Sequence, residues 1–92
     1  MRVDYFLKIS RLVKRRSLAK EMCDKHLVQV NDQPAKAGKE LEAGDTLRLT
    51  FRHRTLTVQV EQIPERAVSK KDAPTLYTVL EDVRKPQDPL LD

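Results

Sequence analysis

The sequence contains a single cysteine, Cys23, only two glycines and no tryptophan. One thiol cannot form a disulfide within the chain, which fits a reducing compartment such as the cytoplasm. Two isolated glycines cannot build a glycine-rich phosphate loop, and Cys23 is not spaced from His26 and His53 as zinc ligands are. We therefore expect no cofactor and no metal ion.

Side chains that could carry catalysis are equally scarce. His26 and His53 are the only histidines, so a small ribonuclease would need both of them in one cleft. Cys23 lies beside the apolar face of a predicted helix, where a buried and unreactive thiol is expected. We predict that the protein is not an enzyme, with a small ribonuclease as the alternative.

Long hydrophobic runs are absent, and aromatic residues make up only 4% of the chain. The sequence therefore predicts no membrane span and no secretory signal. So few aromatic residues do not favour a sheet that stacks bases on exposed rings. Phe6 and Phe51 fall on predicted apolar faces and are expected in the core, whereas Tyr5 lies off that face and is a candidate RNA contact.

Positive charge is concentrated at the N-terminal end. Residues 1–26 contain eight Lys or Arg and three acidic residues, an excess of +5; the remainder contains ten and eleven, which gives the net charge of +4. A small basic protein of this kind most often binds nucleic acid. The candidate phosphate contacts are Arg2, Lys8, Arg11, Lys14, Arg15, Arg16 and Lys20.

The spacing of apolar residues predicts two short helices near the N-terminus. Residues 3–9 place their apolar side chains on one face of a helix. A second helix is expected to begin with Ser17 as its N-cap and to end near Lys25 or His26. Both helices are short, so packing must hold them in place.

Alternating apolar and polar residues then predict strands. The alternation covers residues 27–31, 46–52 and 54–63, and the last two are expected to form an antiparallel hairpin. Residues 31–34 are predicted as a turn, and residues 35–37 as a short return strand.

Residues 1–63 are therefore expected to form one α+β domain, with two helices packed on a small antiparallel sheet. Pro64 ends the strand pattern, and residues 64–92 are predicted to be a C-terminal extension that is frayed over residues 84–92. The extension is expected to dock on the core through Leu76, Tyr77 or Val79.

Five spaced motifs give the chain a resemblance to a known family. They are Arg2-Val3-Asp4-x-x-Leu7, Ser10-Arg11, Arg15-Arg16-Ser17-x-Ala19, Val28-x-Val30-Asn31 and Gly44-Asp45. In this order they resemble the RNA-binding domain first seen in ribosomal protein S4, also called the alpha-L motif. His26 and Asp32 stand where that family commonly has glycine, and both are expected to need left-handed backbone geometry.

Residues 6–21 and 76–80 resemble more particularly the RqcP-type ribosome-associated quality-control factors, relatives of the ribosome-associated fifteen-kilodalton heat-shock protein. The resemblance implies binding to stalled large ribosomal subunits, contacts with peptidyl-tRNA and ribosomal RNA, and support of C-terminal alanine tailing. The implied partners are therefore these two RNAs and a tailing factor on the same subunit. We expect the protein itself to be a cytoplasmic monomer.

The predicted RNA surface lies where the two helices meet. Basic residues between Arg11 and Arg16 occupy the turn and the start of the second helix, where free backbone N–H groups also attract anions. Arg2 is expected near the same edge, and Asp4 is expected to cap its helix or to pair with a nearby arginine and orient it.

A DNA-binding regulator is the alternative from another class. It would use the second helix as a recognition helix in the major groove. That helix exposes Glu21 and Asp24 and lacks the Asn or Gln side chains that read bases. The composition of this helix therefore favours RNA over DNA.

Overall fold

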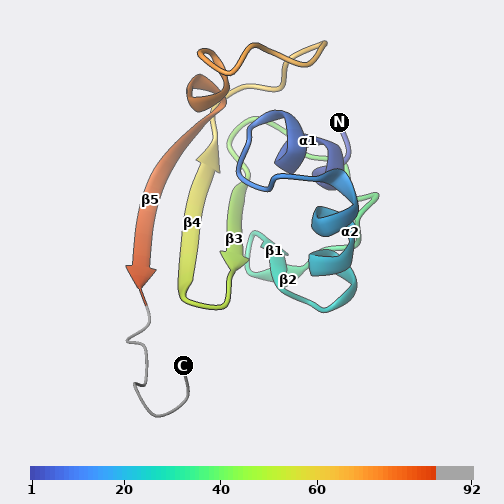
Figure 1. Cartoon of the computed structure of the whole chain (residues 1–92), viewed down its shortest axis with the longest axis vertical. Helices are drawn as coiled ribbons and strands as arrows, with labels where there is room; N and C mark the ends of the chain where they lie inside the picture. The colour runs from blue at the N-terminus through green and yellow to red at the C-terminus, as the bar shows by residue number, and fades with distance from the viewer. Residues whose placement is uncertain (85–92) are drawn as a thin grey trace.

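The structure is a computed structural model that describes residues 1–84, and it contains two helices and a five-stranded antiparallel sheet (Figure 1). The predicted α+β class is confirmed. The elements are α1 (Val3–Ile9), α2 (Arg16–Asp24), β1 (Val28–Val30), β2 (Gln33–Pro34), β3 (Thr46–Thr50), β4 (Arg54–Val60), the 3-10 helix η1 (Ala73–Leu76) and β5 (Tyr77–Arg84). The strand order is β2-β1-β3-β4-β5, which places β5 at the edge away from the helices.

The core lies between the two helices and the sheet. Phe6 and Leu7 of α1 are fully buried, as are Leu47 and Leu49 of β3. The alternation of β3 and β4 points one set of side chains at the helices, because successive residues of a strand face opposite sides. Phe51 is half-buried at the margin of this core.

The start of α2 differs from the prediction that Ser17 caps it. The N-cap is Arg15, two residues before Ser17, so the first helical residue is Arg16, and the cap makes no side-chain hydrogen bond. An ion pair between Arg16 and Asp4 joins the first residue of α2 to α1. A tertiary contact, and not a serine cap, therefore marks where this helix starts.

The hairpin of β1 and β2 is tighter than predicted. Its turn consists of Asn31 and Asp32, whose φ angles are 51° and 69°, as a two-residue type I′ turn requires. The prediction of a return strand over residues 35–37 is wrong, because Gln33 and Pro34 form it. Proline is tolerated there because β2 is an edge strand.

Strand β5 was not predicted from the sequence. It pairs with β4 from Tyr77 to Arg84, with a register shift on β4 between Thr57 and Val58. Most of the strand is exposed on both faces, so its sequence lacks the alternation that identifies half-buried strands.

Of the three residues expected to dock the C-terminal extension, Leu76 is 1% exposed and Tyr77 is half-buried against the core, whereas Val79 is 51% exposed. The predicted frayed end, residues 84–92, lies outside the described residues except for Arg84. The domain boundary at residue 63 stays a prediction.

Candidate nucleic-acid interface

A buried carboxylate organises the predicted surface. Asp4, in the first turn of α1, is only 3% exposed. Its Oδ1 accepts hydrogen bonds from the Tyr5 backbone N–H at 2.8 Å and from Arg2 Nε at 3.2 Å. Its Oδ2 accepts from Arg2 Nη2 and from Arg16 Nε, both at 3.3 Å. These partners offset the cost of burying the charge, and the expected pairing of Asp4 with a nearby arginine is confirmed.

The two arginines are held in place but remain available to a ligand. Each side chain is 49% exposed while it pairs with Asp4. The guanidinium of Arg16 also lies over the Tyr5 ring, 5.2 Å from its centroid. The guanidinium of Arg2 lies against Gly38, where a β-carbon would be 3.9 Å from Arg2 Cζ. Both guanidinium groups are therefore oriented before a ligand binds, which lowers the entropic cost of binding.

Two neighbouring hollows connect these arginines to Lys8 of α1 and to Arg11 in the turn that follows it. Arg2, Tyr5 and Arg16 line a surface hollow of about 570 Å³. Tyr5, Lys8 and Arg11 line a second hollow of about 190 Å³. Because Tyr5 borders both hollows, the four cations form one continuous surface. We call it the α1 band, consisting of Arg2, Lys8, Arg11 and Arg16.

The turn after α1 fixes the position of Arg11. This residue has a φ of 62°, so it ends the helix in the left-handed conformation that usually favours glycine. Its backbone N–H donates to the Lys8 carbonyl at 3.1 Å. Buried Ser10 donates from Oγ to the Leu7 carbonyl at 3.3 Å. The inter-helix turn is therefore locked by local hydrogen bonds.

The other predicted cations lie on or before α2. Lys14 and Arg15 are exposed and line a separate hollow together with Leu18 and Glu21. Lys20 is exposed one helical turn after Arg16. All seven predicted cations are therefore accessible, and four of them form the α1 band. That these residues contact RNA stays a prediction.

Sequence reasoning missed the segment that forms the opposite wall of both hollows. Ile63, Pro64 and Glu65 border the first hollow, and Ala67 and Val68 border the second. The available signal was the isolated apolar pair Ile63 and Val68 in a polar stretch, and both pack against the core.

The features considered for catalysis do not form a site around α1. Neither His26 nor His53 lines the two hollows beside the α1 band. Burial, and secondarily the charges of Asp4 and Asp24, raises the pKa of the Cys23 thiol to about 11, so the thiol is protonated at neutral pH. Within residues 1–84, no cluster of His, Cys, Asp and Glu could hold a metal ion, and no helix could cross a membrane.

With the helix pair, the sheet and the pairing of Arg2 and Arg16 with Asp4 described, the chain can be compared with known proteins. Residues 1–47 match the model of the S4 domain. The "RQC P-site tRNA stabilizing factor" of Bacillus subtilis strain 168 is 42% identical over 82 residues, which cover 89% of this chain and 94% of the relative. The factor of the same name from Halalkalibacterium halodurans is 47% identical over 79 residues, 86% of this chain and 89% of the relative.

A solved structure agrees with this class. The trimeric Heat Shock Protein 15 of Vibrio cholerae superposes with a TM-score of 0.80 at 33% identity, covering 86% of this chain and 80% of that one. The chain belongs to the S4 domain family, in the group that includes the RQC P-site tRNA stabilizing factors. The resemblance inferred from the five motifs is thereby confirmed.

Proposed function

We propose that this protein binds large ribosomal subunits that carry stalled peptidyl-tRNA, contacts the tRNA and ribosomal RNA, and supports C-terminal alanine tailing of the stalled chain. The observation that carries the proposal is the pair of half-exposed arginines, Arg2 and Arg16, fixed by one buried carboxylate. The names of the relatives supply the setting, because they describe stabilisation of a tRNA in the ribosomal P site.

The α1 band suits the backbone of structured RNA. The deep groove of A-form RNA is closed to side chains, so proteins recognise it by phosphates, 2′-hydroxyls and shape. A guanidinium presents a planar fork that binds a phosphate through two hydrogen bonds. Asp4 accepts from Nε and Nη2 of Arg2 and from Nε of Arg16, and among residues 1–84 the other N–H groups of both guanidiniums have no hydrogen-bond partner. The mechanism is therefore binding, without a chemical step.

The proposed partners act together on one subunit. The protein stabilises the peptidyl-tRNA, and a separate tailing factor adds the alanines. We place this activity in the cytoplasm, where the subunits are, and propose that one monomer binds each subunit.

The direct test uses cosedimentation of the purified protein with large subunits that bear peptidyl-tRNA. Replacing Arg2 and Arg16 together by alanine is expected to weaken binding at least tenfold, since two phosphate contacts are lost. The slope of log affinity against log salt is expected to become shallower by about 1 to 2. The matched control replaces Arg52, an exposed arginine in the β3–β4 connection, by alanine.

Wild-type affinity in the Arg2 and Arg16 variant would show that the RNA surface lies elsewhere. Failure of the unmodified protein to bind any large subunit, together with tight binding to duplex DNA, would replace the proposal with the DNA-binding alternative.

A further inference from the structure

Residues 61–76 connect β4 to β5 and form a loop that is closed at its base. The Glu61 N–H donates to the Leu76 carbonyl at 2.8 Å, and Gln62 Nε2 donates to the Thr75 carbonyl at 3.3 Å. Leu76 is 1% exposed and anchors this base in the core. The loop therefore has a defined position although its sequence is largely polar.

Three cations of this loop are exposed: Arg66, Lys70 and Lys71. Within residues 1–84, none of them has a carboxylate oxygen at ion-pair distance. The loop also contains three acids, Glu61 at its base, Glu65 and Asp72, so its formal net charge is zero. Asp72 accepts a hydrogen bond from Ser69 Oγ at 3.1 Å, and Glu65 borders the hollow beside Arg2. The three positive charges are therefore free to meet an anionic partner.

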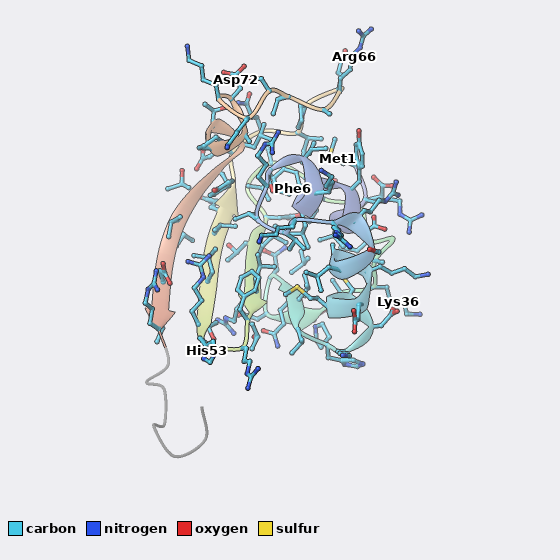
Figure 2. The ribbon with its side chains drawn as sticks, viewed as in Figure 1. Met1, Phe6, Lys36, His53, Arg66 and Asp72 are labelled. Atoms are coloured by element: carbon cyan, nitrogen blue, oxygen red, sulfur yellow. The ribbon has the colours of Figure 1, made fainter. Side chains whose placement is uncertain are left out.

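The loop lies next to the α1 band. Ala67 and Val68, which follow Arg66, form the wall of the hollow opposite Lys8 and Arg11. Arg66 and Asp72 project at the end of the molecule where Met1 lies, and His53 lies at the opposite end (Figure 2). An RNA strand on the α1 band would therefore pass beside the loop.

We propose that this loop is a second RNA-contacting element, in which Arg66, Lys70 and Lys71 bind phosphates of the same RNA that lies on the α1 band. The inference rests on the proposed function and extends it beyond residues 1–47, the part that matches the S4 domain. Two lysines and one arginine on a tethered loop provide charge and reach, and phosphate contacts of this kind fix position without reading bases.

The test replaces Arg66, Lys70 and Lys71 by alanine and measures affinity for peptidyl-tRNA-bearing large subunits between about 50 and 200 mM salt. We expect affinity at the low-salt end to fall about tenfold or more, and the salt slope to become shallower by about 2 to 3, because three counterion-releasing contacts are lost. A charge-preserving variant, R66K with K70R and K71R, is expected to retain wild-type binding. Urea unfolding of both variants is expected to match the wild type, since the three side chains are exposed.

A photo-crosslinker placed at Lys70 identifies the partner directly, and we expect RNA crosslinks. Crosslinks to ribosomal protein alone, or a wild-type affinity and salt slope in the triple alanine variant, would overturn the inference. If that variant binds normally while the Arg2 and Arg16 variant does not, the loop proposal fails and the proposed function stands. If the unmodified protein binds no subunit, both fail.

Discussion

At the scale of single residues, Asp4 is the side chain on which the candidate surface depends. It lies buried beneath the surface and would repel phosphate, yet it aligns the two arginines that face solvent. We therefore expect Asp4 to favour RNA binding by orienting the arginines, whereas its negative charge alone would oppose binding.

Replacing Asp4 by asparagine is expected to weaken binding to large subunits about as much as Arg16→Ala does. If charge alone mattered, removing a negative charge would strengthen RNA binding. Asp24→Asn removes the same charge at an exposed position of α2 and is therefore the control. A double-mutant cycle of D4N with R16A should show strong non-additivity, because both changes break one ion pair. Tighter binding of D4N would contradict the geometric role.

His26 occupies a position that favours glycine. Its φ is 61°. Its N–H donates to the Cys23 carbonyl at 3.0 Å, and the Leu27 N–H donates to the Met22 carbonyl at 2.8 Å. These two bonds form the Schellman ending of a helix, in which a left-handed residue follows the cap. Asp32 meets the same requirement in the β1–β2 turn, so both departures from the family pattern keep the family geometry.

His26→Gly is expected to raise the free energy of unfolding by about 0.5 to 1 kcal/mol. The left-handed conformation costs a non-glycine residue roughly 1–2 kcal/mol, which exceeds the added chain entropy of glycine of about 0.5–1 kcal/mol. Urea denaturation measures the difference. The control, His26→Ala, keeps the penalty and should bring no gain, so equal stability of the two variants would refute the strain at this position.

At the scale of elements, η1 and β5 are held by a few anchors. Leu76 is buried at the junction of η1 and β5, whereas Leu80, within β5, is 53% exposed. The same type of side chain therefore has two different environments only four positions apart. The anchor at Leu76 fixes both the last strand and the base of the loop that precedes it.

Leu76→Ala is expected to lower the free energy of unfolding by about 2–5 kcal/mol, because it removes buried apolar atoms and leaves a cavity. Leu80→Ala should change stability by less than about 0.5 kcal/mol, as exposed substitutions do. Urea unfolding of both variants provides the measurement. A similar loss of stability at the two positions would mean that Leu80 is also buried, and that β5 packs against more of the protein than β4.

At the scale of the whole molecule, Cys23 reports on the contact between helices and sheet. It is 4% exposed on α2 and belongs to the core cluster. Its thiol becomes accessible only when the helix layer opens, and the raised pKa of about 11 further suppresses its reactivity.

We expect Cys23 to react with a thiol reagent at neutral pH only at the rate of opening of the fold.

The raised pKa also has a consequence for stability. The folded state favours the protonated thiol. The contribution of the thiol to the free energy of unfolding is therefore complete below the unfolded pKa of about 9 and is lost as pH rises toward about 11. Wild type should therefore lose more stability than Cys23→Ala over that interval, as measured by urea unfolding at each pH. Equal losses, or rapid labelling of the native protein, would contradict this burial.

The sequence by itself determined the class of fold, the helix over residues 3–9, the alternation of β3 and β4, and the concentration of cations at the N-terminal end. These features depend on local periodicity and composition, which a single sequence displays directly. The five motifs also sufficed to indicate the family, because their order and spacing are properties of the chain itself.

Only the tertiary structure decided how those cations are arranged. Arg16, the first residue of α2, bonds to Asp4, twelve residues earlier, and β5 is paired with β4 without a sequence pattern of its own. The isolated apolar pair Ile63 and Val68 did not place the wall formed by residues 63–68, because the partial burial of Val68 depends on which element it packs against. Contacts between residues distant in sequence leave no local period, so the aligned arginines and the neighbouring loop emerge only when the chain has folded.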